Sequence, residues 1–232
     1  LMKSRRLNDF MCCVVLGLNI SAKVVREFRT LFYDAIQLFF PDGCKGCQGG
    51  LIAGEHLLCT DCIAELSADL AQGRRITDSL VTVPGLAEGW ILLGFRQGGI
   101  VQNILHELKY HHQPEIGLEL GRILGSVLKE QQGSISAEII IPIPLHKRRQ
   151  MARGYNQSSC IANGLSVGLG ITVREDLLKR TRATQTQTRK TRFERWLNVR
   201  EAFKVVDPNA IAGRNIILVD DVITTGSTLE AC

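Results

Sequence analysis

The chain has 232 residues, of which 45% are hydrophobic, and its formal net charge is +5. This composition is typical of a globular protein and excludes collagen-like, low-complexity and intrinsically disordered chains. Residues 174–200 contain nine basic and three acidic residues, and residues 145–157 contain four basic residues and no acidic one. Such segments attract polyanions such as phosphates, nucleic acids or anionic lipids, although a solvated helix face has the same pattern.

Residues 1–40 form a separate N-terminal segment. Basic residues precede an apolar run over residues 10–18, as in a signal peptide. No small-residue cleavage site follows, and the run is too short to span a membrane. Targeting and an incorrectly assigned translation start both remain open. Apolar residues at steps of three and four over residues 24–39 predict an amphipathic helix.

Two Cys-x2-Cys pairs, Cys44 with Cys47 and Cys59 with Cys62, define a module over residues 41–72. Two such pairs complete a tetrahedral thiolate site for Zn²⁺. Four protein ligands leave no position for a catalytic water, so the zinc is expected to be structural. A redox dithiol or a site that has lost its metal are the alternatives. Metal-bound thiolates favour a reducing compartment, and we expect a cytoplasmic protein.

After a polar linker over residues 72–78, the pattern predicts an α/β domain over residues 80–232. Continuous apolar runs without strict alternation are typical of buried parallel strands. The expected strands lie at residues 90–95, 139–143, 171–173 and 216–219. The expected helices lie at residues 100–108, 118–128 and 157–169. No segment of this domain approaches the length of a membrane span.

The strongest signature of function follows the strand at residues 216–219. Asp220 and Asp221 stand at its carboxyl end, where open α/β sheets bind ligands. Two adjacent carboxylates suit neighbouring ribose hydroxyls, with Mg²⁺ nearby. The turn that follows presents backbone N–H groups and hydroxyls suited to one phosphate. A simple helix cap is the alternative. The residues of this turn are Thr224, Thr225, Gly226, Ser227 and Thr228.

This signature resembles the motif by which type I phosphoribosyltransferases bind phosphoribosyl pyrophosphate (PRPP). Together with the four cysteines, the segment Ile141–His146 and the segment Arg153–Gln157, it resembles the ComF family of competence-associated and GntX-like proteins. The resemblance extends from about Phe39 to the end of the chain. It implies a parallel-sheet type I phosphoribosyltransferase-like fold preceded by a small zinc-ribbon-like module. Because the family fold continues beyond the phosphate turn, we also expect the chain to be truncated at its C-terminus.

The resemblance also implies roles for single residues. Asp220 and Asp221 would be the catalytic pair that binds the ribose hydroxyls, and Thr224 to Thr228 would bind the 5′-phosphate. The loop Leu145–Arg149 would hold pyrophosphate, through Lys147 and Arg148 with Arg153 behind them. The basic residues 179–195, with Arg180 among them, would cover the site.

The implied function is binding of PRPP and Mg²⁺, with transfer of phosphoribosyl to a nitrogen acceptor and release of pyrophosphate. The alternative is a non-catalytic module that acts in competence and DNA uptake through single-stranded DNA or a helicase partner. Fold alone does not decide between them. The sequence leaves open the acceptor, the catalytic competence and the oligomeric state.

Overall fold

The computed structural model describes residues 43–71, 74–75, 89–91, 99–132, 135–181, 202–223 and 226–232. The chain divides into two compact units, Leu1–Asp42 and Gly43–Cys232, and all described residues belong to the second. The helix expected over residues 24–39 and the basic residues 182–200 lie outside the described residues. The predicted domain boundaries therefore stay predictions.

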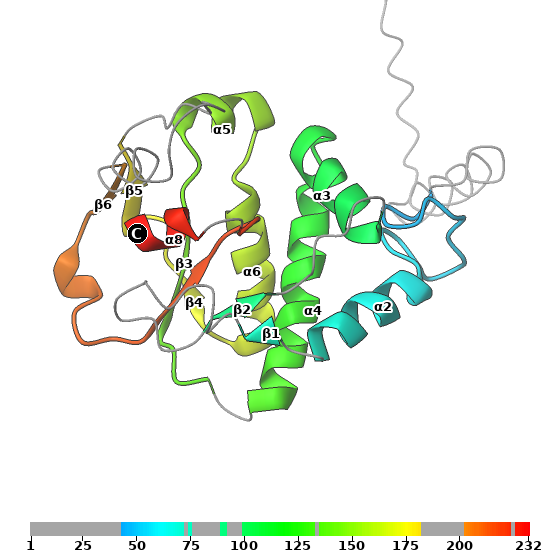
Figure 1. Cartoon of the computed structure of the whole chain (residues 1–232), viewed down its shortest axis with the longest axis horizontal. Coiled ribbons are helices and arrows are strands. Elements are labelled where there is room, and N and C mark those ends of the chain that lie inside the picture. Colours follow the sequence, from blue (N-terminus) through cyan, green and yellow to red (C-terminus); the bar gives the residue numbers. More distant parts are fainter. Residues whose placement is uncertain are drawn as a thin grey trace, which may run out of the picture. The chain divides into compact units, whose positions relative to one another are not determined.

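A three-stranded parallel sheet forms the centre of the described unit (Figure 1). Strand β3 (Ile139–Pro142) lies between β4 (Thr172–Val173) and β7 (Ile216–Val219). Ile139 pairs with Ile216, and Pro142 pairs with Val219 at the carboxyl end, where a proline costs the ladder little. The predicted α/β class and the parallel order of these strands are confirmed.

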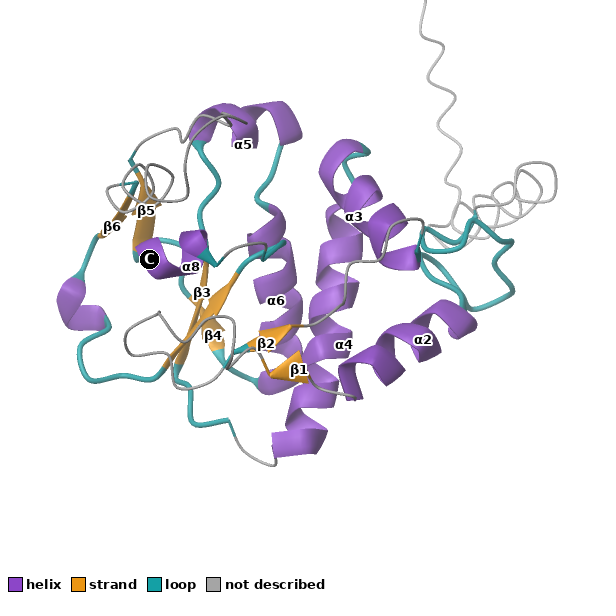
Figure 2. Ribbon diagram, viewed as in Figure 1, coloured by secondary structure: helices purple, strands orange, loops and turns teal. Residues whose placement is uncertain are grey.

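Helices cover one face of this sheet in successive layers (Figure 2). Helix α6 (Gln157–Leu169) contacts all three strands, and α4 (Pro114–Gln132) packs against α6. Helices α2 (Thr60–Ala71) and α3 (Ile100–Tyr110) then pack against α4. The helices expected at residues 100–108, 118–128 and 157–169 are confirmed.

Glycines allow α4 and α6 to approach closely. A Cβ atom at Gly121 would lie 2.1 Å from the carbonyl oxygen of Ile161, and one at Gly164 would lie 2.0 Å from the carbonyl oxygen of Leu118. No side chain fits at such distances, so the two backbones are in direct contact. This contact between glycines was not predicted from the sequence. Gly117 and Gly125 on α4 and Gly168 on α6 belong to the same contact.

The opposite face of the sheet carries a second, smaller apolar cluster. Ile140 points to the helices, whereas Ile139 and Ile141 point to the other face, as expected for successive strand residues. Their partners include residues of the antiparallel pair β5 (Leu178–Arg180) and β6 (Phe203–Val205). This pair brings part of the C-terminal half of the chain over the sheet.

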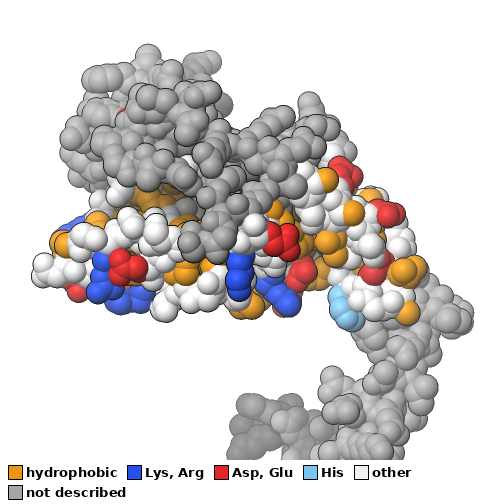
Figure 3. Space-filling view, turned by 90° about the horizontal axis from the view of Figure 1, so that it is seen from below, with side chains coloured by type: hydrophobic (Ala, Val, Ile, Leu, Met, Phe, Trp, Pro, Cys, Tyr) orange, Lys and Arg blue, Asp and Glu red, His pale blue; other side chains and the backbone are white. Residues whose placement is uncertain are grey.

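The remaining described elements are short. Strands β1 (Arg74–Arg75) and β2 (Trp90–Ile91) pair antiparallel, so a part of the predicted linker belongs to a strand. On the face shown in Figure 3, acidic and basic side chains are interspersed among the described residues. None of the helices in the described ranges has the length and apolarity needed to cross a membrane. The other elements are α5 (Lys147–Arg153), η1 (Pro208–Ala210) and α8 (Ser227–Ala231).

Candidate functional site

The four predicted zinc ligands form one cluster. The Sγ atoms of Cys44 and Cys62 are 3.6 Å apart, and those of Cys47 and Cys59 are 3.8 Å apart. All four Sγ atoms lie within 4.8 Å of one another. A zinc ion with Zn–S bonds of about 2.3 Å places its sulfurs at the corners of a tetrahedron with edges of about 3.8 Å. The cysteines therefore fit a zinc ion, and each is a free thiol rather than part of a disulfide.

Backbone hydrogen bonds prepare these sulfurs to bind a cation. Burial would raise the pKa of Cys44, but backbone N–H groups of Cys47, Cys59 and Gly46 lower this pKa to about 6. The Cys59 and Gly46 nitrogens donate to the Cys44 Sγ at 3.2 and 3.4 Å. Burial raises the pKa of Cys62, beside Cys44, well above its usual range. A bound cation is therefore needed to keep all four groups as thiolates.

The cysteine module is joined to the helices by close packing. Cys44 and Cys62 are buried in the main hydrophobic core. A Cβ atom at Gly46 would lie 2.8 Å from the Cys62 Sγ, so the first cysteine turn requires glycine here. The Asn103 amide on α3 donates a hydrogen bond to the Gly46 carbonyl at 2.7 Å. The cysteine module thus stabilises the start of α3.

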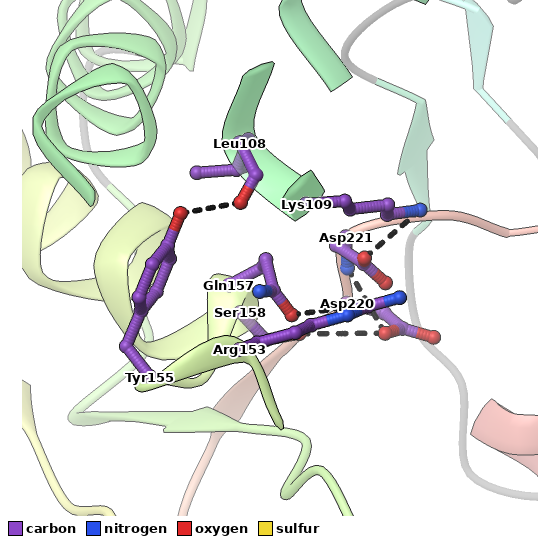
Figure 4. A network of polar contacts seen from close by, with 8 residues as sticks. All are labelled: Leu108, Lys109, Arg153, Tyr155, Gln157, Ser158, Asp220 and Asp221. Atoms are coloured by element: carbon purple, nitrogen blue, oxygen red, sulfur yellow. Dashed lines mark hydrogen bonds and ion pairs between the residues drawn. The ribbon is translucent and has the colours of Figure 1, made fainter. Parts of the chain in front are cut away.

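The predicted acidic pair lies at the carboxyl end of β7 (Figure 4). The Asp220 Oδ1 accepts hydrogen bonds from the Asp221 backbone nitrogen at 2.9 Å and from the Ser158 hydroxyl at 3.4 Å. Burial raises the pKa of Asp220 to about 7, and the charge of Asp221 adds to the effect. Asp220 is thus a carboxyl group that has lost most of its contact with solvent.

Lys109 on α3 pairs with the second acid. Its Nζ lies 3.1 Å from the Asp221 Oδ2, and the two side chains are only 19% and 16% exposed. The Tyr155 hydroxyl donates a short hydrogen bond to the Leu108 carbonyl and so fixes the end of α3 beside the site. Lys109 was not identified from the sequence, because it is one polar residue of an ordinary amphipathic helix.

Polar side chains fill the start of α6, directly behind the acids. The residues Asn156, Gln157, Ser158 and Ser159 are all at least nine-tenths buried. The Arg153 Nη1 donates a hydrogen bond to the Gln157 Oε1 at 2.9 Å. The same guanidinium lies over the ring of Tyr110, with its Cζ 5.8 Å from the ring centroid. Arg153 is therefore already engaged by groups of the protein.

The segment Leu145–Arg149 differs from the expected loop. Helix α5 begins at Lys147, because the His146 Nδ1 accepts a hydrogen bond from the Arg148 backbone nitrogen at 3.2 Å. The helix ends at Gly154, whose φ of 79° suits glycine. Lys147 and Arg148 are consequently exposed residues of a helix. This prediction of a loop was wrong for the residues from Lys147 onward.

Other basic side chains act on the acidic edge. Burial lowers the pKa of the Arg180 guanidinium, the charge of Arg149 lowers it further, and Asp220 raises it. These mutual effects place the three charges near one another. Arg180 on β5 also lies over the ring of Phe203, with its Cζ 5.1 Å from the ring centroid. Arg180 is therefore a described cation near Asp220, and Arg149 lies near Arg180.

Curated relatives of the chain are proteins of competence and DNA utilization. Competence protein F of Haemophilus influenzae is 28% identical over 205 residues, which cover 83% of this chain and 89% of that protein. DNA utilization protein YhgH of Escherichia coli K12 is 34% identical over 129 residues, 54% of this chain and 56% of that protein. Competence protein ComFC of Bacillus subtilis is 36% identical over 92 residues, 40% of this chain and 35% of that protein. These relatives agree with the resemblance of the chain to the ComF family.

No protein-family model and no solved structure matches this chain. The fold and the cysteine cluster agree with the expected family architecture. The turn predicted to bind phosphate is described only in part, because Thr224 and Thr225 lie outside the described residues. Gly226 is buried with a φ of 74°, α8 begins at Ser227, and Thr228 is half-buried.

Proposed function

We propose that this protein binds PRPP at the carboxyl end of β7, with Asp220 and Asp221 on the two ribose hydroxyls. The observation that carries the proposal is the state of Asp220, whose burial raises its pKa to about 7. Hydroxyl groups of a ribose would donate hydrogen bonds to this carboxylate in addition to those from Ser158 and the Asp221 nitrogen. Parallel α/β sheets bind their ligands at this edge.

The anionic ends of PRPP would meet groups on both sides of the acids. The 5′-phosphate would lie on the turn from Thr224 to Thr228, beside the left-handed Gly226. Pyrophosphate would lie toward Arg149 and Arg180, because the charge of Arg180 interacts with those of both Arg149 and Asp220. Lys147, Arg148 and Arg153 would add to the positive field without direct contact in the unliganded arrangement.

Magnesium fits the donor set, because Mg²⁺ prefers carboxylate oxygens and phosphates. Asp220 and Asp221 would hold the ion, and Lys109 would leave Asp221 or share it. When bound with PRPP, the ion would neutralise charge that develops on the departing pyrophosphate.

In the transfer reaction, the bond between ribose C1 and the pyrophosphate oxygen breaks, and its electron pair leaves with pyrophosphate. The nitrogen of the acceptor forms the new bond to C1 and releases its proton to solvent. No side chain is needed as a nucleophile. The residues contribute by orienting the ribose through Asp220 and Asp221 and by stabilising the leaving group electrostatically.

The zinc module would have a structural role in this protein. Its four thiolates leave no open coordination position. Through Gly46 and Asn103 it fixes the start of α3, and the end of the same helix carries Lys109 to the acidic site. Loss of zinc should therefore weaken PRPP binding indirectly.

The second candidate function is a non-catalytic role in competence and DNA uptake through single-stranded DNA or a helicase partner. The names of the relatives support it, as do the exposed basic residues of α5. If the protein binds single-stranded DNA through phosphates, its affinity should fall steeply as salt rises. An affinity that is unchanged between low and moderate salt would contradict this role for α5.

Thermal unfolding with separate ligands tests the PRPP proposal. PRPP with Mg²⁺ at about one hundred times its dissociation constant should stabilise the protein by about 2.7 kcal/mol. Ribose 5-phosphate or pyrophosphate alone at the same concentration should stabilise it less, because each fills only part of the site. An identical midpoint with and without PRPP would contradict the proposal.

A further inference from the structure

A second group of metal-binding side chains lies on α3, away from the cysteines in sequence. His106, Glu107 and His111 offer one ligand atom each, and these atoms lie within 4.8 Å of one another. The two histidines are exposed and the carboxylate is half-buried. The Lys109–Asp221 pair of the proposed PRPP site does not include any of the three.

The backbone of α3 holds this group together. Glu107 and His111 are four residues apart on the helix, and the His111 Nδ1 lies 2.8 Å from the Glu107 Oε1. The rings of His106 and His111 meet edge to face, with centroids 5.1 Å apart. The ring of Tyr110 lies 4.9 Å from that of His106 and limits its movement. His111 is also the residue that ends α3, where the helix dipole favours a cation.

We propose that His106, Glu107 and His111 bind a second zinc ion, separate from the ion of the four cysteines. Imidazole nitrogens and a carboxylate oxygen are suitable ligands for Zn²⁺, and three protein ligands leave one tetrahedral position open for water. A zinc ion between Glu107 and His111 replaces the hydrogen bond that they now share. The three ligand atoms already lie within 4.8 Å of one another.

Zinc content at equilibrium tests this site. The full chain, with its cysteine site already loaded, is dialysed against a series of free zinc concentrations, and bound zinc is measured by mass spectrometry. The wild type should bind two ions per chain, and His106→Ala/His111→Ala should bind one. The matched control is His112→Ala, because this neighbouring exposed histidine bonds the Arg153 carbonyl through Nδ1 instead. The control should bind two ions.

A single ligand can be tested in the same way. Glu107→Gln keeps the size of the side chain. The affinity of this variant for the second ion should fall by at least about tenfold, because even the loss of a residue that only hydrogen-bonds a metal ligand costs that much. Co²⁺ added to the zinc-loaded protein supplies a second readout. It should bind without the absorption of a cobalt–thiolate bond, and the double variant should lose this binding.

Three results would overturn the proposal. A wild type that never exceeds one ion per chain lacks the site. A double variant that still binds two ions places the second ion elsewhere. Loss of the second ion by the His112→Ala variant would show that His112 is a ligand and that the proposed set of histidines is wrong. Circular dichroism of each variant shows whether it has folded, and Glu107→Gln remains informative if the double variant has not.

Discussion

Replacing Asp220 by Asn should stabilise the protein at neutral pH. The pKa of Asp220 is raised from 3.8 to about 7, first by burial and then by the charge of Asp221. Below pH 4 the carboxyl group is protonated in both folded and unfolded chains. Between about pH 4 and pH 7 the unfolded chain ionises first, so the free energy of unfolding falls as pH rises. Above pH 7 the folded protein bears the full free-energy cost of ionising Asp220.

The size of the effect follows from the two pKa values. A difference of about 3 between them corresponds to about 4 kcal/mol, which is an upper limit because Asp220 and Asp221 titrate together. Asn keeps an oxygen that can accept the hydrogen bonds of Ser158 and the Asp221 nitrogen. The variant should therefore gain stability without losing these contacts.

Urea unfolding of the zinc-loaded proteins from pH 5 to pH 8 measures the effect. The difference in unfolding free energy between Asp220→Asn and wild type should grow up to about pH 7.5 and then level off. Asp176→Asn is the control, because Arg174 holds the pKa of Asp176 at about 2, below the range tested. Its difference from wild type should not change with pH. A difference for Asp220→Asn that is equally flat would refute the reasoning.

Three further predictions concern packing and charge. Gly46→Ala should weaken zinc binding in a chelator competition, because its Cβ would lie 2.8 Å from the Cys62 Sγ, whereas Gly50→Ala, with no atom within 4 Å of its Cβ, should not. Gly121→Ala should destabilise the protein to urea by at least about 2 kcal/mol through overpacking against α6, and Val167→Ala, which is 70% exposed, should have little effect. Lys109→Met should cost about 1–3 kcal/mol at pH 8 by leaving Asp221 unpaired, and Lys109→Met/Asp221→Asn should recover part of that loss. Equal effects of the glycine variants and their controls, or no recovery in the double variant, would contradict these assignments.

Local patterns predicted much of the fold. The apolar run at residues 139–143 became the central strand, and the helical spacing at residues 157–169 matches α6 from its first to its last residue. The cysteine spacing likewise predicted the cluster, because the two sulfurs of a Cys-x2-Cys turn can both point at one ion. In each case the information lies within a few residues of the element itself.

The missing parts of the site depend on contacts between distant segments. Lys109 meets Asp221 across more than one hundred residues of chain, and no local pattern links them. Nothing in the local sequence distinguishes Arg149 from its basic neighbours Lys147 and Arg148. The glycines of α4 and α6 became meaningful only when the two backbones were seen in contact. The prediction of a loop at Lys147 was wrong because His146 caps the N-terminus of α5 there.

The proposed function depends on the binding of PRPP by Asp220 and Asp221. Isothermal titration calorimetry of PRPP with Mg²⁺ into the zinc-loaded full chain tests it most directly, with Asp220→Asn/Asp221→Asn as the variant and Asp176→Asn as the control. Wild type and control should bind one PRPP per chain, and the double variant, folded by circular dichroism, should bind none. No heat of binding with wild type, or equal affinity of the double variant, would contradict the claim.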